Sequence, residues 1–198
     1  MTLERIPNAA SLSSIQALLF DLDGTLADTA ALNVDSYAKA LSEAGIAVPA
    51  GILERESPGR HWRQFLAPII ASAGGSVKPE SIANRKKVIY GGLVHQVRLN
   101  DALLSLLEAC HGRLRTALVT TASRANVDAL LDAHALRRHF DVIVTGDDVE
   151  HHKPDPEAYV QAARLLGIDP CRCLVFEDSR IGEQSAHAAG MKTQLISF

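Results

Sequence analysis

The chain has 198 residues, of which 47% are hydrophobic and 22% are charged, and its formal net charge at pH 7 is −3. A chain of this length and composition can bury one good core together with a smaller subdomain, as soluble globular proteins do. The small negative charge offers no basic surface for nucleic acid or an anionic membrane, and no apolar run reaches the roughly 20 residues that span a bilayer. The composition therefore predicts that neither nucleic acid nor a membrane is a partner.

The cellular compartment is indicated by the N-terminus and by the cysteines. Residues 1–14 are polar and mixed, and they lack the apolar core of a signal peptide. The three cysteines, Cys110, Cys171 and Cys173, form an odd and sparse set, which is typical of a reducing compartment. We therefore expect a cytoplasmic protein.

The first predicted strand covers the apolar run 15–20, and two carboxylates, Asp21 and Asp23, follow directly at its carboxyl end. Gly24 permits an abrupt turn at this point. In an open α/β sheet, ligands bind where the carboxyl ends of the strands meet. Two carboxylates crowded there repel each other unless a cation lies between them or one of them is protonated. By itself an Asp-x-Asp pair after a strand is more often a turn or a helix cap, so its interpretation depends on the rest of the chain.

The next part of the chain, residues 30–97, is predicted to be entirely helical. Apolar spacing indicates three helical stretches, over residues 30–44, 62–73 and 79–97, and we find no convincing strand between residues 30 and 100. Asp28 and Thr29 are expected to cap the first of these helices and to form part of a hinge. This segment therefore predicts a small helical insert after the first strand.

From residue 101 onward, predicted helices and strands alternate. Asp101 can cap the first of these helices. The helices are expected over 101–111, 124–135, 157–166 and 180–189, and the strands over 114–120, 141–145, 173–176 and 193–196. This alternation predicts an α/β fold with a doubly wound parallel sheet, Rossmann-like in type. We expect a catalytic core from residues 1–29 and 98–198, with residues 30–97 as a cap over the carboxyl edge of the first strand.

Four polar clusters lie where predicted strands end or where loops cross the same edge of the sheet. They are Asp21 with Asp23, Thr120–Thr121, Lys153, and Glu177–Ser179. Together they provide carboxylates for a divalent cation, a lysine and hydroxyl groups. This set suits a phosphoryl group, because phosphoryl transfer depends above all on charge neutralisation and positioning. Magnesium prefers a few carboxylates plus water and phosphate oxygens as ligands.

These four clusters, in this order, resemble the motifs of the haloacid dehalogenase-like superfamily, from about residue 15 to residue 196. The insert resembles the helical cap of the branch that holds β-phosphoglucomutase and small sugar-phosphate phosphatases, and the segments 111–113 and 151–154 resemble its phosphatases. The resemblance implies a Mg²⁺-dependent phosphatase acting on a small phosphorylated metabolite such as a sugar phosphate. A sugar phosphomutase, which uses the same motifs, and a non-catalytic relative are the alternatives.

The resemblance also implies residue roles. Asp21 would be the nucleophile that forms an aspartyl-phosphate, and Asp23 would protonate the leaving oxygen and then deprotonate the attacking water. Because a leaving alkoxide needs a proton and a halide does not, Asp23 argues for phosphate chemistry over dehalogenation. Thr120 would hold a phosphate oxygen, with Thr121 beside it, and Lys153 would pair with Asp21 and the phosphoryl group.

The metal and substrate contacts follow from the same resemblance. Mg²⁺ would be bound by Asp21, the backbone carbonyl of Asp23, and Asp178, with Glu177 helping directly or through water. In the insert, Arg60 could reach a second anionic or hydroxyl-rich group of the substrate, although a solvated arginine is the more common role for such a position. The adjacent His151 and His152 resemble a metal pair, but neighbouring histidines rarely converge on one ion, so we expect them in a surface loop.

Overall fold

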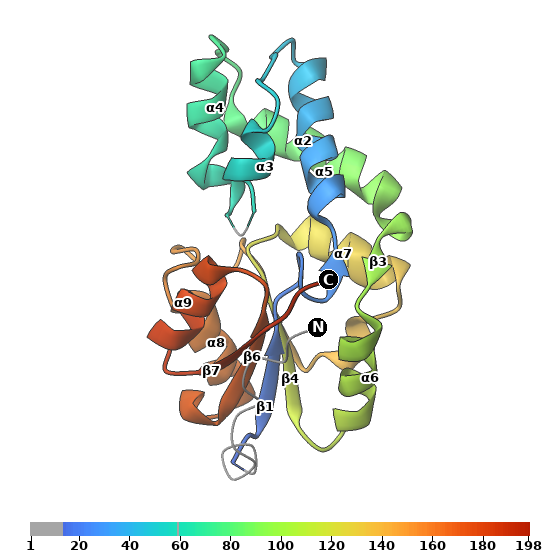
Figure 1. Ribbon diagram of the computed structural model, residues 1–198, viewed down its shortest axis with the longest axis vertical. Coiled ribbons are helices and arrows are strands. Elements are labelled where there is room, and N and C mark those ends of the chain that lie inside the picture. Colours follow the sequence, from blue (N-terminus) through green and yellow to red (C-terminus); the bar gives the residue numbers. More distant parts are fainter. Residues whose placement is uncertain (1–13, 59) are drawn as a thin grey trace.

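The computed structural model describes residues 14–58 and 60–198, so the sequence-based interpretation of residues 1–14 lies almost wholly outside the described part. Its centre is a five-stranded sheet in the order β5-β4-β1-β6-β7, and all neighbouring strands are parallel (Figure 1). The strands are β1 (Ala17–Phe20), β4 (Arg115–Val119), β5 (Val142–Val144), β6 (Cys173–Glu177) and β7 (Lys192–Leu195). The predicted doubly wound parallel sheet is confirmed.

Helices cover both faces of this sheet, and the alternation of side chains along each strand explains why both faces are apolar. From β1, Leu18 and Phe20 belong to one buried cluster, and Ala17 and Leu19 belong to the other. The first cluster packs against α6 (Asp101–Cys110) and α7 (Arg124–Ala133), and the second packs against α8 (Glu157–Leu166) and α9 (Arg180–Ala188). Figure 1 shows the two helix pairs on opposite sides of the strands.

A helical insertion follows β1, as predicted, and Figure 1 shows it grouped at one end of the molecule, apart from the sheet. It consists of α2 (Ala30–Glu43), α3 (Ile52–Glu56), η1 (Trp62–Gln64), α4 (Leu66–Ser72), α5 (Pro79–Leu93) and η2 (Val94–Gln96). The insertion has a hydrophobic core of its own, to which Trp62 and Phe65 belong. A separate core is what allows such an insertion to hold its shape beside the sheet.

The insertion leaves and rejoins the core through a short two-stranded ribbon, which the sequence analysis missed. β2 (Ala27–Asp28) pairs antiparallel with β3 (Arg98–Leu99), so the prediction of no strand between residues 30 and 100 is wrong. An exposed ion pair between Arg98 and Asp28, with 3.0 Å from Nη2 to Oδ2, joins the two strands. Two-residue strands carry almost no propensity signal, because pairing with a distant partner defines them.

The caps of two helices differ in part from those expected. α6 is capped by Asn100, whose Oδ1 accepts from Leu103 N at 3.3 Å, and Asp101 is the first helical residue. Thr29 occupies the N-cap position of α2, as expected, but its hydroxyl makes no capping bond and instead donates to Asp23 Oδ1. Asp28 faces Arg98 rather than α2. Among the described residues, no helix is long and apolar enough to cross a membrane.

Candidate active site

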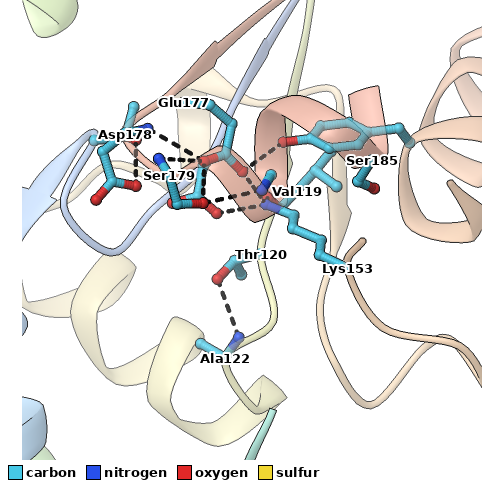
Figure 2. A network of polar contacts seen from close by, with 12 residues as sticks. Val119, Thr120, Ala122, Lys153, Glu177, Asp178, Ser179 and Ser185 are labelled. Carbon is cyan, nitrogen blue, oxygen red and sulfur yellow. Dashed lines mark hydrogen bonds and ion pairs between the residues drawn. The ribbon is translucent and has the colours of Figure 1, made fainter. Parts of the chain in front are cut away.

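The carboxyl edge of the sheet carries a buried ionic network centred on Lys153 (Figure 2). Its ammonium Nζ donates to Asp21 Oδ1 at 2.7 Å, to Glu177 Oε1 at 2.6 Å and to the carbonyl oxygen of Val119 at 3.1 Å. Lys153, Asp21 and Glu177 are 2%, 6% and 1% exposed. Three of the four polar clusters predicted from the sequence therefore meet at one buried amine.

The parallel pairing of the strands explains this convergence. Asp21 follows β1, and its N–H donates to the carbonyl oxygen of Phe176 in β6 at 3.0 Å. Thr120 follows β4, and its N–H donates to the carbonyl oxygen of Val144 in β5 at 3.0 Å. Because parallel strands end at the same edge, residues far apart in the chain become neighbours there.

Burial and charge act against each other in this network. Burial raises the pKa of Asp21 well above its usual value; Lys153 opposes that rise, and the nearby carboxylates of Glu177 and Asp178 add to it. Burial alone would lower the pKa of Lys153, but Asp21 and Glu177 raise it well above its usual value. Burial would likewise raise the pKa of Glu177, yet the Lys153 cation holds it below its usual range. Lys153 and Glu177 therefore form a charged pair. The Lys153 cation does not fully offset the negative charge of Asp21, because Glu177 shares it.

Both oxygens of Glu177 are already engaged. Oε1 accepts from Lys153 and also from the Tyr159 hydroxyl at 2.9 Å. Oε2 accepts from the N–H groups of Asp178 and Ser179 at 3.2 Å and from Ser179 Oγ at 3.0 Å. Tyr159 in α8 was not singled out in the sequence, because no local pattern indicates which helical tyrosine faces a carboxylate.

Asp178 is held differently from Glu177. Its carboxylate lies against the Gly24 turn, where φ is +89° and a Cβ would stand only 2.1 Å from Oδ2. Thr25 Oγ1 contacts Oδ1 at 3.4 Å. Burial, and then the charge of Glu177, raise the pKa of Asp178 to about 6. A glycine is thus required at position 24 to admit this carboxylate beside the Asp21–Asp23 turn.

The donor set fits a divalent cation. Asp21, Glu177 and Asp178 each offer a carboxylate oxygen, and these three atoms lie within 4.8 Å of one another. With the Lys153 cation, the four groups carry an excess of negative charge, and Asp178 is exposed while Asp21, Glu177 and Lys153 are buried. Burial makes such an uncompensated charge unfavourable. Hard oxygen donors with a few open positions are what Mg²⁺ prefers.

Asp23 lies on the insertion side of the site. Its Oδ1 accepts from the Thr29 hydroxyl and from Asn33 Nδ2 at 3.0 Å. Asn33 in turn accepts from Lys86 Nζ at 2.5 Å through its Oδ1. The Asp23 side chain is therefore connected through Asn33 to Lys86 of the insertion.

Lys86 of α5 is a functional candidate that the sequence analysis missed. It is only 3% exposed, its Nζ lies 4.2 Å from the ring centre of Tyr90 and 5.1 Å from that of Tyr37, and it has no carboxylate partner among the described residues. Burial lowers its pKa to about 8. A signal did exist, because Lys86 lies four residues from both Ile82 and Tyr90, on the apolar face of the helix.

A cavity of about 400 Å³ separates the insertion from the core. Asp23, Asp178 and Thr121 line it from the core, and Lys86, Trp62 and Arg60 line it from the insertion. A cavity of this size accepts small molecules.

Two residues expected to contact the substrate have other partners in the structure. Thr120 is buried at 2% exposure and accepts from Ala122 N at 3.0 Å, so it shapes the loop behind Thr121. Arg60 is exposed and forms an ion pair with Glu56 at 2.7 Å.

The two adjacent histidines lie in different surroundings. His151 is exposed, and its Nδ1 contacts Glu157 Oε2 at 2.8 Å. His152 lies in the same loop and is half-buried, because its ring stacks on His61 of the insertion with 4.0 Å between ring centres. No three-ligand cluster that includes these histidines occurs in the described residues.

Comparison with known proteins agrees with this class of fold and site. The sequence profile of the haloacid dehalogenase-like hydrolases matches residues 18–196. The chain therefore belongs to the haloacid dehalogenase-like hydrolase family. It is an enzyme, a hydrolase whose curated relatives include several phosphatases.

Two relatives and one solved structure show how similar the chain is to known proteins of this family. The chain is 34% identical to the fructose-1-phosphate phosphatase of Escherichia coli over 176 residues, which are 88% of this chain and 92% of that protein. It is 30% identical to a phosphorylated-carbohydrates phosphatase of Thermotoga maritima, with coverage of 90% and 83%. The crystal structure of CbbY from Rhodobacter sphaeroides with xylulose-1,5-bisphosphate has a TM-score of 0.85 at 28% identity, with coverage of 93% and 87%.

Proposed function

We propose that this protein is a magnesium-dependent phosphatase that hydrolyses a small sugar phosphate through a phosphoaspartate on Asp21. The observation that carries the proposal is the Lys153 ammonium, held 2.7 Å from Asp21 Oδ1 beside a cavity of about 400 Å³. A carboxylate can attack a phosphate dianion only where positive charge offsets their repulsion. Relatives at about 30% identity that act on sugar phosphates support the choice of substrate class.

Magnesium would be held by Asp21, Asp178 and the backbone carbonyl of Asp23, and it would supply positive charge to the phosphoryl oxygens. Glu177 would act mainly by orienting Lys153, because both of its oxygens already accept hydrogen bonds. Water-mediated help from Glu177 to the metal is compatible with this arrangement.

The first half-reaction transfers the phosphoryl group to the enzyme. A carboxylate oxygen of Asp21 attacks phosphorus, the P–O bond to the sugar breaks, and Asp23 gives its proton to the departing sugar oxygen. Lys153 and the Thr120 loop, with Thr121 at its cavity side, would hold the phosphoryl oxygens. Arg60 would contact the sugar part only after leaving its present ion pair with Glu56.

The second half-reaction regenerates the enzyme. Asp23, now ionised, takes a proton from a water molecule whose oxygen attacks phosphorus, and the bond to Asp21 breaks with release of inorganic phosphate. A mutase would instead return the phosphoryl group to a second hydroxyl of the same sugar. Hydrolysis therefore depends on whether water or a sugar hydroxyl meets the phosphoaspartate.

The proposal is tested by measuring inorganic phosphate release from a panel of sugar phosphates and other small phosphomonoesters, with Mg²⁺ or with EDTA. We expect Mg²⁺-dependent release that falls by at least about 10³-fold in Asp21→Asn, because an amide is a poor nucleophile. Asp132→Asn, which changes an exposed carboxylate in α7, should retain the activity. A folded protein that only isomerises sugar phosphates would be a mutase, and one with no reaction on any compound would overturn the proposal.

A further inference from the structure

His61 of the insertion lies against the core at the side of the cavity. It is 1% exposed, and its ring stacks on that of His152 with 4.0 Å between centres and 25° between planes. The contact joins the segment before η1 to the loop between β5 and α8. Because His152 immediately precedes Lys153, a residue of the insertion contacts the neighbour of the buried ammonium.

Gly146 of the core also lies close to the His61 ring. A Cβ on Gly146 would stand 2.7 Å from His61 Cδ2 and 2.3 Å from the carbonyl oxygen of Thr121. Gly146 therefore lies between His61 and the β4–α7 loop without room for a side chain. The His61 ring thus contacts the loop that carries Lys153 at two places, Gly146 and His152.

The hydrogen bonds of His61 fit a neutral ring. Its Nδ1 accepts from the N–H of Arg63 at 3.4 Å, so the proton of the neutral ring is on Nε2. Both His61 Nε2 and His152 Nδ1 are buried without a hydrogen-bond partner among the described residues. A second proton on His61 would convert Nδ1 to a donor and oppose the Arg63 N–H.

We propose that the stack of His61 on His152 is a latch that seats the helical insertion on the core and positions Lys153 for catalysis. Both histidines are positioning residues, because they act through Lys153 and do not touch the reacting atoms. The latch is expected to hold only while both rings are neutral.

The charged groups around His61 oppose its protonation. Besides burial, His152, Arg63 and Lys87 disfavour a cation at this position, and Asp147, with Oδ1 4.0 Å from Nε2, favours it. The balance lowers the pKa of His61 to about 3.

The pKa of His152 is shifted in the same direction as that of His61. Burial, Arg63 and His151 lower its pKa, against the opposite effects of Glu157 and Asp147. A released histidine takes up its proton near pH 6.5, so the unseated state binds more protons than the seated state below that pH. The latch is therefore complete above about pH 6.5 and weakens as the pH falls through this range.

The catalytic test compares two neighbouring histidines and two replacements. We expect His152→Gln to lower kcat about tenfold with a smaller change in KM, as loss of positioning does. His151→Gln, which alters the exposed neighbour, should keep kcat. His152→Phe retains an aromatic ring without a titrating group, so it should restore kcat at pH 7.5 and shift the acid limb of the kcat profile to lower pH.

An independent readout comes from Trp62, the only tryptophan of the chain, whose ring centre lies 5.4 Å from that of His61. A protonated imidazole quenches a neighbouring indole. The fluorescence of the wild type should decrease with a midpoint well below pH 6.5, and in His152→Gln the midpoint should move toward pH 6.5. This titration needs no substrate, so it tests the latch even if the proposed activity fails.

The inference rests on the proposed phosphatase function only for its kinetic readout. Equal fluorescence midpoints in the wild type, His152→Gln and His151→Gln would overturn the latch. So would an unchanged kcat in His152→Gln, whereas a silent wild type with the expected fluorescence shift would overturn only the proposed function. Circular dichroism at each pH confirms that the variants compared are folded.

Discussion

At the scale of single residues, two adjacent carboxylates differ in the partners that the fold gives them. Glu177 accepts from five groups, including the Lys153 ammonium, whereas Asp178 lies against Gly24 with a weak contact from Thr25. Burial and the Glu177 charge raise the pKa of Asp178 to about 6. The oxygens of Glu177 are therefore occupied by hydrogen bonds within the protein, whereas those of Asp178 are available to a cation.

This difference predicts opposite effects of two isosteric substitutions. Glu177→Gln places amide donors against existing N–H donors and removes the charge that pairs with Lys153, so it should lower the free energy of unfolding by about 3 kcal/mol. Asp178→Asn relieves repulsion and should raise the melting temperature measured in EDTA. Added Mg²⁺ should raise the melting temperature of the wild type and not that of Asp178→Asn. A destabilised Asp178→Asn that still responds to Mg²⁺ would contradict the assignment.

The buried ammonium of Lys86 is expected to lower the free energy of unfolding. A buried ammonium without a carboxylate partner among the described residues is unfavourable, and its contacts with Asn33 and two tyrosine rings offset only part of the desolvation. It lies in the cavity wall and is connected through Asn33 to Asp23, so we propose that it serves the site. Stability and activity are expected to change in opposite directions at such a position.

We expect Lys86→Met to raise the free energy of unfolding by about 1–2 kcal/mol at pH 7 and to lower kcat/KM for the sugar phosphate. The pKa of Lys86 is lowered to about 8 in the folded protein, so the destabilisation is complete below pH 8 and disappears as the pH rises toward 10.4. The gain measured by urea unfolding should therefore be smaller at pH 10 than at pH 7. Lys39→Met, on the exposed face of α2, should show neither the gain nor the pH dependence.

At the scale of elements, the insertion is fixed to the core at two separate places. One is the β2–β3 ribbon, which continues through Asn100, whose N–H donates to the carbonyl oxygen of Leu26 at 2.9 Å. The other is the contact of His61 with Gly146 and His152. We propose that residues 30–97 form a cap that turns about the ribbon and closes at the histidine contact.

Substitutions at two glycines distinguish a steric clash at Gly146 from the general effect of replacing a glycine. Gly146→Ala should destabilise the seated insertion by about 1–3 kcal/mol, because a Cβ would stand 2.3 Å from a backbone carbonyl. Gly91→Ala, within α5 and with no atom within 4 Å of its Cβ, should stabilise the protein by about 0.5–1 kcal/mol. Urea unfolding measures both, and equal effects of the two substitutions would argue against a tight contact at Gly146.

At the scale of the whole molecule, the cavity exists only because two separately packed parts face each other. The sheet has a core on each face, and the insertion has a third. Asp23, Asp178 and Thr121 line the cavity from the core, while Lys86, Trp62 and Arg60 line it from the insertion. A cavity of about 400 Å³ between two packed parts is of a size that accepts a small molecule.

Much of this arrangement could be predicted from the sequence. Apolar runs of four to six residues alternating with helical periods indicate a parallel sheet, and polar residues directly after those runs must then meet at its carboxyl edge. Asp21, Thr120 and Glu177 follow this rule, whereas Lys153 comes from the loop between β5 and α8. Its ammonium contacts Asp21, Glu177 and the carbonyl of Val119, the residue before Thr120. The rule is local, because it needs only the end of each strand and the direction of the sheet.

The remaining features were decided by the tertiary structure. The short pair of β2 and β3 is defined by partners 70 residues apart, as in the Arg98–Asp28 contact. The buried state of Lys86, the donors to Glu177 and the stacking of His61 on His152 depend on which side chains tertiary packing brings together. The sequence by itself determined which groups reach the sheet edge. Only packing decided which of them are paired, charged or neutral, because desolvation and distance, rather than residue type, set those energies.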